Sequence, residues 1–175
     1  MEKNSSSIYL KSVTNSDVEF LFDLLKERDP RANISHKKMP TYDEHVNFVK
    51  SKPYSKWYII FKSEQKAGSI YLSKNYEIGI FISKKFKVKN IGNFALNELM
   101  KKNPRKRFLA NVNPKNKKLS RFFSKNNFKL IYSTFQLDGK KDENLKPHDK
   151  RKIEFYKKNG YRILSHAYMF EKNSK

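Results

Sequence analysis

The chain has 175 residues, no cysteine and a formal net charge of +22, from 39 lysines and arginines against 17 aspartates and glutamates. This length fits one compact domain, and a hydrophobic content of 37% excludes a disordered basic tail. The missing cysteines exclude a disulfide scaffold, a cysteine zinc site and a thiol nucleophile. Because no apolar run approaches the roughly 18 residues of a membrane span, we expect a cytoplasmic protein that is neither exported nor inserted into a membrane.

The positive charge indicates nucleic acid or another polyanion as a candidate partner. Only seven of the 39 basic residues are arginines, and the basic residues are spread from Lys3 to Lys175 instead of gathering in one segment. A lysine-rich, solvated surface is the simpler interpretation of this distribution. A basic module that binds RNA or another polyanion is the alternative.

The first predicted elements are a strand and a helix. Apolar and polar residues alternate over 8–13, which is typical of a strand. Ser16 and Glu19 have the spacing of a capping box, which predicts the start of a helix. The apolar face of this helix comprises Val18, Leu21, Phe22 and Leu25.

A second capping box, Thr41 and Glu44, predicts a short helix after a polar loop. Val46 and Val49 fall on its buried side, and His45 falls on the solvent or boundary side. Three apolar runs separated by polar turns follow and predict an antiparallel meander. They span residues 57–61, 67–72 and 77–82.

The second half of the chain alternates helices and strands. Helical spacing of apolar residues and two further strand patterns occur over 91–100, 107–112, 119–123 and 128–137. The order β-α-α-β-β-β-α-β-α-β predicts an α/β (α+β) fold, with a mixed, mostly antiparallel central sheet and helices on both faces. This domain occupies residues 7–137.

The remaining segment, 138–175, contains an internal repeat. Residues 149–163 are similar to residues 116–130 at an offset of 33, without a gap. The repeat predicts an extra helix and strand after a polar linker. We expect this appendage to pack on the same domain and to add its strand, 161–170, to an exposed edge of the sheet.

The stretch most indicative of function runs from a strand through a basic turn into a helix start, over 80–96. The first N–H groups of a helix have no partners inside the helix, and with the positive end of the helix dipole they suit a pyrophosphate. Lys87 and Lys89 add positive charge there. Taken alone, the pattern is also typical of a solvated basic loop.

Two signatures resemble those of the Gcn5-related N-acetyltransferase superfamily. The segment Lys87-Val88-Lys89-Asn90-Ile91-Gly92 aligns with the superfamily's motif Gln/Arg-x-x-Gly-x-Gly/Ala. Lys87 and Asn90 are departures and Gly92 is a match, but asparagine tolerates positive φ and can replace a glycine. The second signature, an asparagine, an aromatic pair and Gly-Phe, is similar to Asn116, Phe122-Phe123 and Asn127-Phe128. The resemblance implies an acyl-CoA N-acyltransferase-like fold and transfer of an acetyl group from acetyl-CoA to a primary amine.

The resemblance also implies which residues hold acetyl-CoA. Backbone amides of the turn bind the pyrophosphate, the backbone of the preceding strand binds the thioester and pantetheine amides, and Asn116 contacts the pantetheine arm. Phe123 stands where the superfamily often has a tyrosine that protonates the departing thiolate. The full set is Ile80, Phe81, Ile82, Lys87, Val88, Lys89, Asn90, Ile91, Gly92, Asn93, Asn116 and Phe123.

Acetylation of an amine also needs a base and a proton source. Glu77, on the strand before the turn, is the best candidate base, and a surface carboxylate at a strand end is the alternative. Asn111 stands where some relatives carry a glutamate, and an amide cannot serve as a base. The resemblance places the loop with His36 over the acceptor pocket. In the repeated helix, Tyr156 is a candidate proton donor, although the repeat is more simply extra core.

The acceptor remains open among an amino sugar, a small amine and a peptide. The positive field favours an anionic acceptor over polycations such as polyamines. No spacing typical of a metal site or of a nucleoside triphosphate site occurs, so we expect no metal. The oligomeric state is open, with a homodimer among the alternatives.

Overall fold

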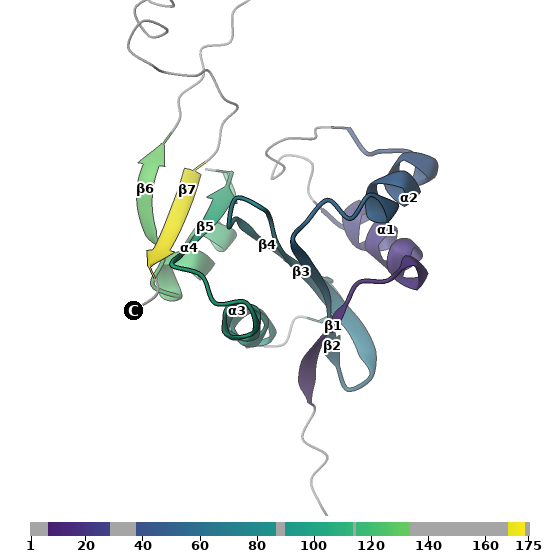
Figure 1. Cartoon of the computed structure of the whole chain (residues 1–175), viewed down its shortest axis with the longest axis horizontal. Coiled ribbons are helices and arrows are strands. Elements are labelled where there is room, and N and C mark those ends of the chain that lie inside the picture. The colour runs from purple at the N-terminus through teal and green to yellow at the C-terminus, as the bar shows by residue number, and fades with distance from the viewer. Residues whose placement is uncertain (1–6, 29–37, 87–89, 114, 134–167, 174–175) are drawn as a thin grey trace, which may run out of the picture.

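Two β-sheets with four α-helices form the structure (Figure 1). The computed structural model describes residues 7–28, 38–86, 90–113, 115–133 and 168–173. In chain order the elements are β1 Ile8–Ser12, a 3-10 turn Asn15–Asp17, α1 Val18–Lys26, α2 Tyr42–Lys50, β2 Lys56–Lys62, β3 Gln65–Leu72, β4 Ile78–Ile82, α3 Ile91–Lys102, β5 Arg107–Val112, α4 Lys117–Lys125, β6 Lys129–Ser133 and β7 Tyr168–Asn173.

The first sheet has the order β1-β2-β3-β4, and every neighbouring pair is antiparallel. β3 contains a continuous run of buried residues, Ala67 to Ile70, as expected for a strand that is covered on both faces. Ser63 and Glu64 connect β2 to β3 with φ values of 44° and 62°. Two positive φ values in a two-residue turn match the right-handed twist of a hairpin. The predicted meander is confirmed.

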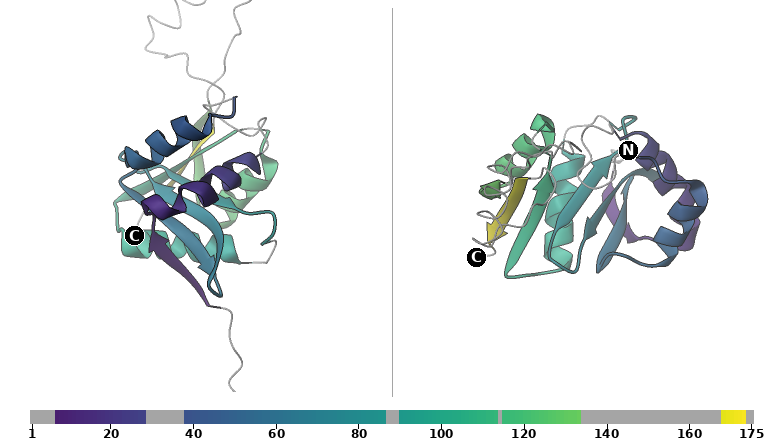
Figure 2. Two further views of the ribbon diagram at one scale, coloured as in Figure 1. Left: turned by 90° about the vertical axis from the view of Figure 1, so that its right-hand side faces the viewer. Right: turned by 90° about the horizontal axis from the view of Figure 1, so that it is seen from above.

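Helices cover both faces of this sheet. On one face, buried side chains of β2, β3 and β4 pack against α3; this core includes Ile60, Ile70, Leu72, Ile78, Ala95, Leu96 and Leu99. On the other face α1 and α2 lie over Ile59, and Val18, Leu21 and Val49 are buried there. The left view of Figure 2 shows α1 and α2 in front of the sheet. Burial of apolar surface at about 25 cal/mol per Å² stabilises both layers.

Two local predictions for the N-terminal helices are wrong. The capping box that precedes α1 lies at Thr14 and Asp17, two residues earlier than the predicted pair of Ser16 and Glu19, and it starts a 3-10 turn. Asp17 accepts hydrogen bonds from the Thr14 backbone N–H and hydroxyl at 2.8 and 2.9 Å. His45 is only 6% exposed, so it belongs to the buried side of α2 and not to the solvent or boundary side.

The second capping box is confirmed. The Thr41 backbone N–H donates to the Glu44 carboxylate at 2.7 Å, and the Glu44 N–H donates to the Thr41 hydroxyl at 3.3 Å. These two bonds satisfy N–H groups that the first turn of a helix leaves without partners. Glu44 therefore fixes the start of α2.

The second sheet has the order β5-β7-β6, with β7 antiparallel to both neighbours. The prediction that the C-terminal strand joins an exposed sheet edge is wrong, because β7 fills the middle of this sheet. Phe170 of β7, for example, is opposite Ala110 of β5 on one side and Leu130 of β6 on the other. The predicted linker and second helix, together with residues 161–167, lie outside the described part of the chain.

Candidate active site

β4 and β5 are neighbours at one point only and then diverge. A single parallel bridge joins Glu77 to Leu109, and the Leu109 N–H donates to the Tyr76 carbonyl at 2.9 Å. Beyond the bridge, β4 pairs only with β3 among the described residues. The backbone of Ile80, Phe81 and Ile82 therefore has an edge toward β5 that no described strand occupies. Such an edge can hydrogen-bond an extended ligand that carries amide groups.

The start of α3, which comes after β4 in the chain, has no side-chain cap. Asn90 is the N-cap residue with a φ of 83°, and its side chain caps no N–H group. The first bond of the helix runs from the Phe94 N–H to the Asn90 carbonyl at 2.9 Å. The N–H groups of the preceding residues, Ile91 to Asn93, therefore have no partner inside the helix. The left-handed conformation expected for Asn90 is confirmed.

α4 packs against this helix start. A Cβ at Gly92 would lie 3.1 Å from the Phe122 ring, so the missing side chain lets the two helices approach closely. The Asn126 amide donates to the Asn93 side-chain oxygen at 3.0 Å. Asn116 caps α4, where its side-chain oxygen accepts from the Leu119 N–H at 3.0 Å. Only the amide NH2 of Asn116 is left for a ligand.

Phe123 lies in the core and not on an exposed surface. Its side chain is 1% exposed, and its ring contacts Phe128 at a centroid distance of 5.0 Å. Asn127 ends α4 at a φ of 64°, while the Phe128 N–H donates to the Phe123 carbonyl at 3.1 Å. These are the bonds of a Schellman motif, whose usual hydrophobic contact is the Phe123–Phe128 pair. The ring therefore has almost no exposed surface to offer a cofactor, and its place in the acetyl-CoA site stays a prediction.

The structure brings Glu77 and Asn111 together where β4 and β5 diverge. The Asn111 amide donates to one Glu77 carboxylate oxygen at 2.8 Å, and the Ser73 hydroxyl donates to the other at 3.4 Å. Glu77 is half-buried. Sequence reasoning considered the two residues separately, because the contact depends on the bridge between two strands far apart in the chain.

A group of aromatic and charged side chains that the sequence analysis missed lies on the α1 side of β4. We call Arg28, Tyr54, Tyr71 and Phe81 the Arg28 cluster. The Tyr54 and Tyr71 rings stack with centroids 3.8 Å apart, and the Arg28 guanidinium lies 5.3 Å from the centre of the Phe81 ring. These residues come from four separate segments, so no sequence motif marks the cluster.

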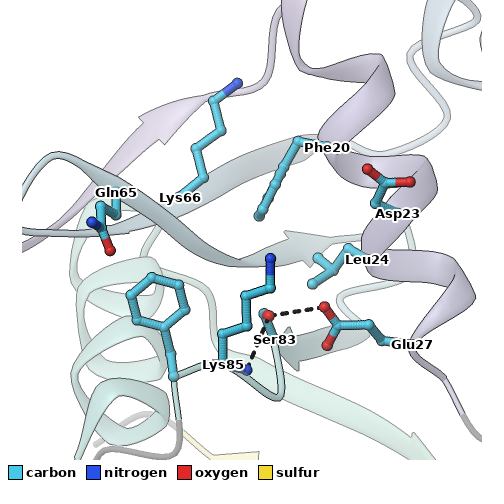
Figure 3. Close-up of a pocket in the computed structure, with 9 residues that line it drawn as sticks. Phe20, Asp23, Leu24, Glu27, Gln65, Lys66, Ser83 and Lys85 are labelled. Carbon is cyan, nitrogen blue, oxygen red and sulfur yellow. Dashed lines mark hydrogen bonds between the residues drawn. The ribbon is translucent and has the colours of Figure 1, made fainter.

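A hollow of about 380 Å³ lies between α1 and the turn after β4 (Figure 3). Across its rim the Glu27 carboxylate accepts from the Ser83 hydroxyl at 2.9 Å and from the Lys84 N–H at 2.6 Å. The residues that line it are Phe20, Asp23, Leu24, Glu27, Gln65, Lys66, Ser83, Lys85 and Phe86. None of them is a predicted site residue. The hollow lies beside the turn that follows β4, and there Glu27 ties α1 to the chain that leads into α3.

Solved structures of acetyltransferases share this fold along nearly the whole chain. An acetyltransferase from Salmonella typhimurium that modifies the N-terminal serine of a ribosomal protein is 18% identical, with a TM-score of 0.68 over 98% of this chain and 97% of that chain. RimL in complex with coenzyme A is 17% identical, with a TM-score of 0.68 over 97% and 95%. A dodecameric spermidine N-acetyltransferase from Vibrio cholerae is 12% identical, with a TM-score of 0.63 over 95% and 93%.

This chain has the acetyltransferase fold. The expected fold class and the resemblance to Gcn5-related N-acetyltransferases are thereby confirmed at the level of the fold. The sequence itself matches no protein-family model and no curated protein.

Several residues predicted for the site of this acetyltransferase fold lie outside the described part of the chain. They are His36, Lys87, Val88, Lys89 and Tyr156. Among the described residues, no group of histidine, aspartate and glutamate side chains has the arrangement of a metal site. No helix in the described ranges is long and apolar enough to cross a membrane.

Proposed function

We propose that the protein transfers an acetyl group from acetyl-CoA to a primary amine. The observation that carries the proposal is the edge of β4 at Ile80–Ile82 that no described strand occupies, followed after one turn by a start of α3 without a side-chain cap, in a chain with the acetyltransferase fold. The similar structures include enzymes that act on a protein N-terminus and on spermidine. Both of those acceptors are amines, which supports an amine as the acceptor here.

The arrangement fits acetyl-CoA because it offers donors for a pyrophosphate and a backbone edge for amides. The first-turn N–H groups of α3, with Lys87 and Lys89 beside them in sequence, would hold the pyrophosphate. The β4 backbone at Ile80–Ile82 would hold the pantetheine amides, and the Asn116 NH2 group is a further donor. Acetyl-CoA supplies an activated acetyl thioester.

Glu77 is the proposed base. The amine nitrogen forms a bond to the acetyl carbonyl carbon while the carbon–sulfur bond breaks, its electron pair leaves with sulfur, and the nitrogen loses a proton. Asn111 and Ser73 orient the Glu77 carboxylate through the hydrogen bonds described above. Because Phe123 is buried in the core, the proton for the departing sulfur comes from water or from another group, and Tyr156 stays a candidate. We expect this activity in the cytoplasm.

The competing function is a basic module that binds RNA or another polyanion, which the net charge of +22 favours. Two double variants of equal charge separate the two functions. Lys87→Glu with Lys89→Glu changes the turn before α3, and Lys50→Glu with Lys52→Glu changes exposed positions at the end of α2. Acetyl-CoA binding is measured by calorimetry at low and high salt, and acetyl transfer to an amine panel by detection of the released thiol.

For an acetyltransferase we expect one site per chain that persists at high salt, at least tenfold weaker binding in the turn variant and little change in the control. Equal weakening in both variants, with binding that disappears at high salt, would instead indicate attraction of a polyphosphate to surface lysines. In that case the proposed function is wrong.

A further inference from the structure

Arg28 carries a positive charge that nothing in the described part of the chain neutralises. It lies two residues past the end of α1, and its guanidinium carbon lies 5.3 Å from the centre of the Phe81 ring on β4. Its Nε atom is buried and has no hydrogen-bond partner among the described residues, and the guanidinium forms no ion pair with a described carboxylate. Buried charged donors in proteins are usually paired, because an unpaired one costs free energy. The position of Arg28 therefore suits an anionic ligand.

Two tyrosine hydroxyls accompany Arg28. Tyr54 and Tyr71 stack with an interplanar angle of 7°. Burial raises the pKa of both hydroxyls, although the positive charge of Arg28 opposes this rise. The hydroxyls are thus protonated at neutral pH and can donate hydrogen bonds. Tyr71 can lie across β4 because its partner in the ladder is Gly79, where a Cβ would overlap the Tyr71 ring.

The opposite charge lies on Glu77, the residue directly before β4. Residues that are two and four apart on a strand share one face, so Glu77, Gly79 and Phe81 point to the α1 side of β4. Four residues of a strand span about 13 Å. The Glu77 carboxylate and the guanidinium over Phe81 are therefore separated by a distance of about this size. One face of β4 therefore presents an anion at one end and a cation at the other, with apolar surface between them.

We infer that the acceptor is an amine that also carries an anionic group, a carboxylate or a phosphate, which Arg28 binds while the amine lies toward Glu77. This inference rests on the proposed acetyl transfer and names its acceptor class. A polycationic acceptor such as spermidine would place a positive charge against Arg28, in addition to meeting the positive field of the whole chain.

The test compares amines that differ only in the anionic group. The panel is phosphoethanolamine against ethanolamine, β-alanine against β-alaninamide, and spermidine as a polycation. We expect at least a tenfold higher kcat/KM for the anionic member of a pair, and the two pairs distinguish a phosphate from a carboxylate. Spermidine should be the poorest acceptor.

Three variants assign the preference to Arg28. Arg28→Gln should reduce the preference for the anionic member of each pair to within about threefold. Arg28→Lys should restore part of it, because lysine keeps the charge but not the planar fork of donors. Arg121→Gln, at an exposed position of α4, is the matched control and should leave the preference intact.

Equal turnover of charged and neutral amines by the wild type would overturn the inference and leave the proposed function standing. A preference that survives in Arg28→Gln would also overturn it. If no amine is acetylated, the rise in Tm on addition of each ligand tests the proposed function and the inference separately. Absence of stabilisation by acetyl-CoA contradicts the proposed function itself. Stabilisation by acetyl-CoA, without any further Arg28-dependent stabilisation by phosphoethanolamine or β-alanine, contradicts only the anionic acceptor.

Discussion

His45 is buried on α2, 5.3 Å from the Phe22 ring, and its Nε2 atom has no hydrogen-bond partner among the described residues. Burial lowers the pKa of this imidazole, so the unfolded chain binds a proton more readily than the folded one. The free energy of unfolding should therefore fall as the pH drops below about 6.5, the ordinary histidine pKa. The loss amounts to about 1.4 kcal/mol for each pKa unit by which burial lowers the value.

Urea unfolding of the wild type and of His45→Gln at pH 7.5 and pH 5.5 checks this prediction. The variant should lose less stability than the wild type between the two pH values. An equal loss in both proteins would assign the acid sensitivity to other groups.

Phe123→Tyr tests whether a hydroxyl at this position serves catalysis, because the resemblance implies a tyrosine there. In this structure the added hydroxyl would enter the core beside Phe128. Burying a hydroxyl without a partner costs about 1–3 kcal/mol, so Phe123→Tyr should lower the free energy of unfolding without raising the rate of acetyl transfer. Phe122→Tyr, on a half-buried ring, should change stability little. A faster reaction in Phe123→Tyr would place that ring at the sulfur.

Local sequence rules predicted the backbone conformation of single residues, whereas the burial of side chains depends on tertiary contacts. The left-handed conformation of Asn90 follows from the glycine position that it occupies and from the tolerance of asparagine for positive φ. The burial of His45 does not follow from the sequence of α2 alone, because it depends on Phe22 of α1. No sequence pattern marked Arg28 as a candidate binding residue, since its neighbours come from distant segments.

At the element scale, Glu27 links the end of α1 to the turn before α3. Its two hydrogen bonds reach Ser83 and the Lys84 N–H. Glu27→Gln removes the charge and leaves an amide that can accept only through one oxygen. We expect a loss of about 1 kcal/mol of stability and weaker acetyl-CoA binding by a factor of about two to ten, because the start of α3 is less well held.

Calorimetry with acetyl-CoA and urea unfolding measure these two effects. Asp23→Asn is the control, because Asp23 pairs only with the exposed Lys26 at 2.9 Å among the described residues and exposed pairs contribute little. Unchanged acetyl-CoA affinity in Glu27→Gln would show that α3 is positioned without this contact.

Helix and strand types were predictable because hydrophobic periodicity and capping residues are local. The capping box before α1 was misplaced by two residues, since Ser16 with Glu19 and Thr14 with Asp17 both have capping-box spacing. Periodicity cannot state which strands are neighbours. The C-terminal strand was expected at an edge for that reason, while pairing with both β5 and β6 places it in the middle.

At the scale of the whole molecule, β7 should be essential for the second sheet. A chain that ends at residue 167 leaves β5 and β6 without a strand between them, and each loses its backbone partners. We expect a loss of at least about 3 kcal/mol, because each hydrogen bond contributes about 0.5–1.5 kcal/mol, and hence a Tm lower by about 6–12 °C. A chain that ends at residue 173 is the control and should melt like the full chain.

The placement of β7 also sets an order of events during protein synthesis. β5 and β6 leave the ribosome before β7, and they are not neighbours in the finished sheet. Until residue 173 has emerged, both strands expose unpaired backbone edges, and such edges attract other unfinished chains. The N-terminal meander, whose partners follow one another closely in the chain, can fold while translation continues. The first sheet can thus fold before the second, and the boundary between the two folding steps lies at the junction of β4 and β5, where we place catalysis. A chaperone that shields extended segments would act on the later half of the chain.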